Sequence, residues 1–206
     1  MCIRDRDWER AWMDRFRPMR FGERLWIRPS GSAIDQEDAV IVDLDPGLAF
    51  GTGTHPTTAL CLEWLDAQDL TGKRVIDFGC GSGILAIAAL KLGARDVVAV
   101  DHDPQAVLAT RDNAARNRVD DRISVVHSAD FVPHAVELVV ANILANVLID
   151  LAPRILAMVR PGGRLLLSGI LHDQAAAVMQ AFARTVEFDP MATRQDWVLL
   201  AGTRCH

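Results

Sequence analysis

The sequence predicts an α/β protein with a mostly parallel, seven-stranded sheet, helices on both faces of that sheet and a C-terminal antiparallel hairpin. Three observations lead to this prediction. From residue 56 onward, short β-branched runs alternate with helical patterns, as they do in βαβ units. After residue 184 the alternation stops, and two strand-like runs follow without a helix between them. The length of 206 residues suits one main domain and is too short for two domains with full cores.

Five runs form the parallel part of the predicted sheet, and five helices accompany them. The strands are expected at 75–78, 97–100, 123–126, 138–141 and 164–168, and the helices at 56–67, 84–92, 104–117, 146–159 and 173–183. Pro56 and Pro104 stand at first helical positions, where a missing N–H costs no hydrogen bond. Asp103 and Asp173 are candidate N-caps, and the Pro-Gly-Gly segment 161–163 is expected to end the fourth helix.

The C-terminal hairpin is predicted from residues 185–188 and 197–202, which a turn-rich segment with Pro190 connects. In the N-terminal part, 25–28 and 40–44 also have strand character, and a Pro-Ser-Gly-Ser turn separates them.

The first 16 residues have a different character. Trp8, Trp12 and Phe16 recur at helical spacing, but nothing upstream is present for this apolar face to pack against. We therefore expect residues 1–20 to be a linker helix left from a truncated N-terminal region, and residues 21–206 to form the main domain.

Composition excludes several classes of protein. The longest apolar run, 84–90, is far shorter than the roughly 20 residues that span a bilayer, and the N-terminus has no signal-like segment. We therefore expect a cytoplasmic protein without membrane contact. A net charge of −5 disfavours direct nucleic-acid binding, although it suits a basic protein substrate. The cysteines predict neither a disulfide framework nor a metal site, because Cys2, Cys61, Cys80 and Cys205 lack the necessary spacing.

A glycine-rich loop, residues 77–83 (Asp-Phe-Gly-Cys-Gly-Ser-Gly), joins the first parallel strand to the next helix. Glycines there allow a tight turn and let a ligand approach the backbone N–H groups at the helix N-terminus. Gly81, Gly83 and Ala86 also match the dinucleotide fingerprint, and Asp101 lies near the position of its ribose-binding acid. The glycines alone therefore leave a nicotinamide dinucleotide and S-adenosylmethionine both open.

Asp77 favours S-adenosylmethionine. A carboxylate before the first glycine would repel a pyrophosphate, whereas it suits the ammonium and sulfonium charges of that cofactor. The same carboxylate can also order the loop or cap the helix. With either cofactor, Asp101 is expected to accept hydrogen bonds from two ribose hydroxyls. A parallel sheet whose last strand is inserted by a hairpin resembles the class I methyltransferase fold, and differs from the all-parallel nicotinamide-dinucleotide domain.

Three further features point to the same edge of the sheet. Residues 50–58 form a loop rich in small and hydroxyl side chains that can act as a lid, although Thr54 or His55 can also simply start the helix. Asn142 ends the fourth parallel strand, where open α/β sheets bind ligands, although it can also be an ordinary turn residue. Asp130 follows the third strand, where it can contact an adenine amino group or lie in a surface loop.

Three motifs together resemble the PrmA family, the methyltransferases of a bacterial large-subunit ribosomal protein. They are D-P-G-L-A-F-G-T-G-T-H-P-T-T at 45–58, V-I-D-F-G-C-G-S-G-I-L-A-I-A-A at 75–89 and V-V-A-N-I-L-A-N at 139–146. The resemblance implies cofactor contacts at Thr58, Gly79, Asp101 and Asn142. It also implies methyl transfer from S-adenosylmethionine to lysine side chains and an N-terminal amine of the ribosomal protein. An additional N-terminal domain recognises that substrate in the family, and we expect this domain to be essentially absent here.

We expect Asn142 to be the catalytic residue. An amide cannot remove a proton from an ammonium, but its carbonyl can accept amine N–H bonds and aim the nitrogen lone pair at the methyl group. His55 can assist, although a helix-start role suits it better, and the other histidines show no metal-ligand spacing. The alternatives are a truncated domain that binds the cofactor without a productive substrate, and a nicotinamide-dependent oxidoreductase. We expect a monomer.

Overall fold

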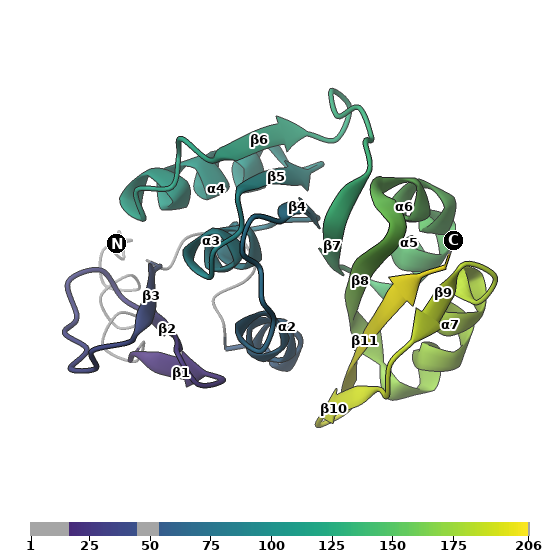
Figure 1. Ribbon diagram of the computed structural model, residues 1–206, viewed down its shortest axis with the longest axis horizontal. Coiled ribbons are helices and arrows are strands. Elements are labelled where there is room, and N and C mark those ends of the chain that lie inside the picture. The colour runs from purple at the N-terminus through teal and green to yellow at the C-terminus, as the bar shows by residue number, and fades with distance from the viewer. Residues whose placement is uncertain (1–16, 45–53, 206) are drawn as a thin grey trace, which may run out of the picture.

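The computed structural model describes residues 17–44 and 54–205 (Figure 1). Residues 1–16 of the expected linker helix and the lid residues 50–53 lie outside the described residues. The expected linker helix does not extend to residue 20, because Met19 and Arg20 form a strand together with Phe21. The division into two regions otherwise stays a prediction. Within the described residues, no helix is long and apolar enough to cross a membrane.

The main sheet has the strand order β10-β11-β8-β7-β4-β5-β6, with β9 also paired to β11. Its five parallel strands confirm the prediction and are β4 (Arg74–Phe78), β5 (Asp96–Asp101), β6 (Ile123–His127), β7 (Val136–Asn142) and β8 (Val159–Leu171). β11 (Trp197–Arg204) runs antiparallel to β8, which confirms the hairpin insertion. The sheet is therefore mixed, and its order reverses next to β4.

The outermost position of the sheet holds two short strands where the sequence predicts one. β9 (Val186–Phe188) pairs with the C-terminal half of β11, and β10 (Ala192–Arg194) pairs with its N-terminal half. Both are antiparallel to β11, whose other edge is occupied by β8. The seven predicted positions are thus present, but the last is divided in two.

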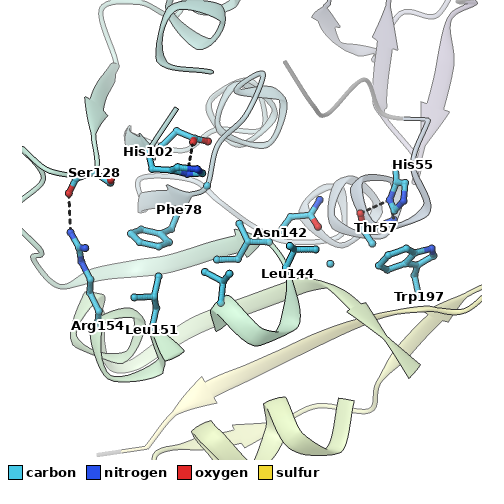
Figure 2. A pocket seen from close by; sticks show the side chains of 15 residues that line it. His55, Thr57, Phe78, His102, Ser128, Asn142, Leu144, Leu151, Arg154 and Trp197 are labelled. Carbon is cyan, nitrogen blue, oxygen red and sulfur yellow. Dashed lines mark hydrogen bonds and ion pairs between the residues drawn. The ribbon is translucent and has the colours of Figure 1, made fainter. Parts of the chain in front are cut away.

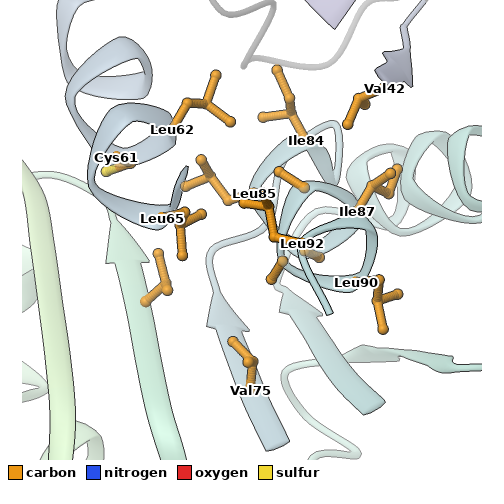
Figure 3. Packing of buried hydrophobic residues seen from close by; sticks show 14 of the residues in the cluster. Val42, Cys61, Leu62, Leu65, Val75, Ile84, Leu85, Ile87, Leu90 and Leu92 are labelled. Atoms are coloured by element: carbon orange, nitrogen blue, oxygen red, sulfur yellow. The ribbon is translucent and has the colours of Figure 1, made fainter. Parts of the chain in front are cut away.

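Helices cover both faces of the sheet, as predicted (Figure 1). One apolar cluster includes residues of α2 (Pro56–Asp66), α3 (Ile84–Lys91) and α4 (Pro104–Arg116). A second cluster, on the opposite face, includes residues of α5 (Ala145–Asp150), α6 (Ala152–Met158) and α7 (Ala175–Phe182). Figure 3 shows Leu62 and Leu65 of α2 packed beside Leu85 of α3 in the first cluster.

The single helix expected at 146–159 is wrong, because the segment forms α5 and α6 with Leu151 between them. Pro153 lies in the first turn of α6, where its missing N–H and its ring prevent continuation from the preceding turn. The Pro-Gly-Gly segment does not end this helix either. α6 ends at Met158, and β8 already begins at Val159, which pairs with Val136.

The two predicted N-caps have different outcomes. Asp103 caps α4, because its carboxylate accepts a hydrogen bond of 2.9 Å from the backbone N–H of Gln105. Asp173 is not a cap, since it lies inside the short 3₁₀ helix η1 (His172–Gln174). There the Gln174 side chain accepts a hydrogen bond from Leu171 N–H instead.

A small sheet of β1 (Met19–Phe21), β2 (Leu25–Arg28) and β3 (Val40–Asp43) packs beside α2 and α3 (Figure 1). The last two strands were predicted, whereas the three residues of β1 are too few to show an alternating pattern. The buried carboxylate of Asp66, on α2, accepts hydrogen bonds from the backbone N–H groups of Glu23 and Arg24. The α2 helix thereby fixes the turn between β1 and β2.

Candidate functional site

A cavity of about 710 Å³ lies where β4, β5 and β7 end, on the edge that the sequence predicts (Figure 2). Its volume lies within the range of small-molecule and cofactor sites. The cavity is lined by His55, Thr57, Phe78, Gly79, Asp101, His102, Ser128, Asn142, Ile143, Leu144, Val147, Leu151, Arg154, Gly169 and Trp197.

The glycine loop passes under this cavity in a conformation that other residues adopt at a cost. Gly79 has φ +83°, and a Cβ there would lie 2.3 Å from Cγ2 of Ile143. Gly83, the N-cap of α3, has φ +78°, and its Cβ would lie 2.6 Å from Cγ2 of Thr110. The loop therefore needs glycine both for its left-handed turns and for close packing against two neighbouring segments.

Asp101 lines the cavity at the end of β5, and backbone groups hold its carboxylate in place. Oδ2 accepts a hydrogen bond of 2.9 Å from Gly81 N–H, and Oδ1 accepts one of 3.0 Å from Asp103 N–H. Each carboxylate oxygen retains further acceptor capacity, so the group can still bind two neighbouring hydroxyls. Gly81 is thus connected to the site through Asp101.

Asp77 lies beneath the glycine loop and does not line the cavity. Its side chain is buried, and Oδ2 accepts a hydrogen bond of 3.0 Å from Ala86 N–H in the first turn of α3. Oδ1 has no hydrogen-bond partner among the described residues. Burial raises the pKa of Asp77 to about 7, and the nearby charge of Asp101 adds to this effect. The helix-capping role considered for Asp77 is therefore present in the structure.

Asn142 lines the cavity at the end of β7, where Thr58 orients its amide. Nδ2 of Asn142 donates a hydrogen bond of 3.4 Å to Oγ1 of Thr58, which is itself buried in α2. Oδ1 of Asn142 has no hydrogen-bond partner among the described residues. Thr58 thus turns the amide so that its carbonyl oxygen remains available as an acceptor.

Gly169 of β8 fixes the chain that follows Asn142. It has φ +83°, and a Cβ there would lie 2.3 Å from the carbonyl oxygen of Ile143. The side chain of Ile143 contacts Gly79 in turn. The segment after Asn142 is therefore held between two glycines, one from β8 and one from the glycine loop.

His55 and Trp197 lie at the same end of the cavity as Asn142 (Figure 2). Their rings make an edge-on contact with centroids 4.8 Å apart. His55 is the N-cap of α2, because its Nδ1 accepts a hydrogen bond of 3.3 Å from Thr57 N–H. Nδ1 also lies 2.7 Å from Oγ1 of Thr57, so the imidazole is bound to the first turn of the helix by two contacts. These contacts favour the helix-start role of His55.

Asp130 is not brought together with the other predicted site residues. It is exposed, and it borders a separate shallow depression with Arg111 and His127. Ser128, two residues earlier, lines the cavity instead. The suggested adenine contact of Asp130 thus has no support in this arrangement.

Several cavity residues were not predicted from the sequence. Phe78, Arg154 and Trp197 lie in a strand or helix whose pattern only indicated structural packing. The hydroxyl-rich loop and the glycine loop gave recognisable signals, whereas these three residues did not.

Cys61, Cys80 and Cys205 are free thiols. Burial raises the pKa of both Cys61 and Cys80 well above the ordinary thiol value, so neither is a nucleophile at neutral pH. Within residues 17–44 and 54–205, no group of three or more potential ligands is arranged to hold a metal ion.

The donor set of the cavity fits S-adenosylmethionine. Asp101 offers a carboxylate for ribose hydroxyls, and Gly79 opens the backbone beside it. Asp77, in contrast, orders the loop from below and is not exposed to the cavity. The sheet order and the antiparallel insertion of β11 complete the arrangement. Fold and site together define a class I S-adenosylmethionine-dependent methyltransferase.

Comparison with known proteins narrows this class. Residues 1–205 match the family described as ribosomal protein L11 methyltransferase (PrmA). The chain is 61% identical over 203 residues to a ribosomal protein L11 methyltransferase of Ectopseudomonas mendocina, covering 98% of this chain and 70% of the relative. The chain belongs to the ribosomal protein L11 methyltransferase family.

Solved structures agree with this assignment. A ribosomal protein L11 methylase from Lactobacillus delbrueckii subsp. bulgaricus superposes with a TM-score of 0.85 at 36% identity, covering 93% of this chain and 100% of that one. An RNA methyltransferase from Salinibacter ruber, solved in complex with S-adenosyl-L-homocysteine, gives a TM-score of 0.57 at 19% identity. That match covers 71% of this chain and 89% of the other, and it supports the fold alone.

Proposed function

We propose that this protein transfers methyl groups from S-adenosylmethionine to amino groups of ribosomal protein L11, namely lysine side chains and the N-terminal amine. The observation that carries the proposal is the oriented amide of Asn142 at one end of the cavity, beside the elements that bind the cofactor. The names of the relatives support the ribosomal substrate.

The cavity has two chemically different ends (Figure 2). Asp101 marks the end that binds the ribose, because its carboxylate is positioned for two hydroxyls. Asn142, His55 and Trp197 mark the other end, where no carboxylate from the described residues lines the cavity. The acceptor amine therefore enters a site that does not stabilise its ammonium form.

When bound, the cofactor supplies a methyl group on a positively charged sulfur, which reacts with a neutral nucleophile by in-line displacement. The chain contributes mainly alignment and exclusion of water. Oδ1 of Asn142 accepts an N–H of the amine, and the Thr58 hydroxyl keeps that oxygen toward the acceptor. Asp101 holds the nucleoside, so that the reacting atoms meet in a fixed geometry.

The acceptor must lose a proton before transfer. At pH 7 this costs about 4 to 5 kcal/mol for a lysine side chain and about 1 kcal/mol for an α-amine. Lysine methylation should therefore rise tenfold for each unit of pH while deprotonation limits the rate, whereas methylation of the N-terminal amine should level off near pH 8.

Replacing Asn142 with alanine tests the central assignment. We expect kcat to fall by about 10- to 100-fold, equivalent to one lost positioning hydrogen bond, with little change in the dissociation constant of the cofactor. Asn146→Ala, an exposed asparagine on α5, is the matched control and should retain full activity. Unchanged turnover in the Asn142 variant would remove the catalytic assignment.

Direct product analysis tests the function itself. Mass spectrometry of L11 incubated with the protein and methyl-labelled cofactor should show mass increments of a methyl group on peptides that contain amines. Cofactor binding without any increment would favour the alternative of a binding domain without a productive substrate. If calorimetry detected binding of a nicotinamide dinucleotide and no binding of S-adenosylmethionine, the oxidoreductase alternative would be favoured instead.

We further propose that the protein acts in the cytoplasm as a monomer, without direct contact with nucleic acid or membranes. The cytoplasmic site is supported by the ribosomal substrate named for its relatives. Light scattering at micromolar concentration should give the mass of one chain, and a dimer mass would correct this part of the proposal.

A further inference from the structure

Arg154 is a cationic side chain of the cavity wall that the proposed reaction does not use. It projects from α6 and lies beside Ser128, at the end of the cavity where His102 also lies (Figure 2). His102 contacts Asp101, so this is the end of the ribose-binding acid. No ion pair joins its guanidinium to a carboxylate of the described residues. A half-buried arginine without a counter-ion must be stabilised by other groups.

Two aromatic rings and one carbonyl stabilise this arginine. The guanidinium carbon lies 5.7 Å from the ring centroid of Phe78 and 6.0 Å from that of Phe131, both within the range of cation–π attraction. Nη2 donates a hydrogen bond of 3.1 Å to the carbonyl oxygen of Ser128. Arg154 therefore connects α6 with the end of β4 and with the segment that follows β6.

The contacts of Ser128 carry this connection to the ribose-binding acid. The backbone N–H of Ser128 donates a hydrogen bond of 2.8 Å to the carbonyl oxygen of Asp101. The carboxylate of Asp101 is held in turn by Gly81 N–H of the glycine loop. A continuous series of hydrogen bonds thus runs from α6 to the loop under the cofactor.

We propose that Arg154 is a positioning residue for the nucleoside half of the cofactor. It fixes the Ser128 segment, and through it Asp101, in the place where ribose and base are bound. The planar guanidinium suits this role because it can face two rings while its edge donates to a carbonyl. The proposal depends on the cofactor and not on the identity of the acceptor.

Calorimetric titration with two ligands tests the proposal without turnover. The ligands are 5′-methylthioadenosine, which has only the nucleoside half, and S-adenosylhomocysteine, which has both halves. For Arg154→Met we expect both dissociation constants to rise by the same factor, roughly five- to thirtyfold. Arg154→Lys should give a smaller rise, because lysine keeps the charge near the rings but lacks the planar fork. The KM for the acceptor protein should stay unchanged.

Arg160→Met is the matched control, since Arg160 is exposed and reaches Glu137 instead of the cavity. It should leave both dissociation constants unchanged. An equal effect of this control, an unchanged methylthioadenosine constant in folded Arg154→Met, or a rise for S-adenosylhomocysteine alone would each overturn the proposal. If Arg154→Met does not fold, Phe131→Leu and Arg154→Lys decide the matter, and unchanged binding of methylthioadenosine in both would overturn it.

Discussion

Replacing Asp77 with asparagine should remove a pH-dependent cost of folding. The side chain is buried, one of its oxygens has no partner among the described residues, and burial raises its pKa from 3.8 to about 7. A carboxyl group with a raised pKa in the folded protein favours folding most when it is protonated. The contribution of Asp77 to the free energy of unfolding is fully present below pH 3.8 and is lost as the pH rises toward 7.

The size of the effect follows from the pKa difference. Three pKa units correspond to about 4 kcal/mol in the free energy of unfolding, of which about 2 kcal/mol is lost between pH 5 and pH 7. Asparagine has no such titration, and its carbonyl can still accept the Ala86 N–H. The stability of the wild type relative to Asp77→Asn should therefore fall by about that amount between pH 5 and 7, and stay level above pH 8.

Urea denaturation of both proteins at several pH values measures this difference. The contributions of the other carboxyl groups to the pH dependence cancel in this difference, because both proteins contain the same groups. The exposed Asp112 of α4 provides the control, and its replacement by asparagine should change stability by no more than about 0.5 kcal/mol. A wild-type-to-variant difference that is constant from pH 5 to 8, or that rises with pH, would refute the reasoning.

Three other substitutions test separate parts of the structure. Gly169→Ala should lower stability by about 1 to 3 kcal/mol and reduce kcat, because the added Cβ meets the carbonyl of Ile143; chemical denaturation and steady-state kinetics measure this. Asp101→Asn should raise the dissociation constant of S-adenosylhomocysteine by about tenfold or more in calorimetry, through loss of a charged acceptor. Arg74 lowers the pKa of Glu137 to about 2, so the stability that Glu137 contributes is present above pH 4.5 and is lost as the pH falls toward 2. Acid denaturation of Glu137→Gln should lack this component.

Much of the fold was predictable because the signals were local. The central strands β4 and β7 are largely buried on both faces, so each forms an apolar run that is readable by itself. Pro56 and Pro104 marked the starts of α2 and α4 correctly. The interruption between α5 and α6 was also encoded locally, in Pro153, but the surrounding apolar pattern suggested one continuous helix.

Site residues at the ends of strands could be predicted from the sequence more readily than site residues in helices. Asp101 and Asn142 follow apolar runs, and the carboxyl ends of parallel strands meet at one edge, which brought both to the cavity. Arg154 contacts Ser128 across 26 residues of sequence, and a helical pattern gives no sign of that contact. The sequence placed Asp77 correctly at the end of a strand, just before the glycines of the loop. It did not reveal that the side chain is buried beneath that loop, because burial depends on the packing of distant residues.

The division of the outermost strand position affects how the molecule behaves in a crowded solution. A long unpaired strand at the edge of a sheet offers its N–H and C=O groups to other chains and promotes aggregation. Here β9 and β10 have three residues each, and Asp189, Pro190 and Met191 separate them. Pro190 cannot donate a hydrogen bond, and Asp189 bonds inward to the carbonyl of Ala201. A neighbouring chain therefore meets two short fragments there, too short to template a continuous intermolecular strand.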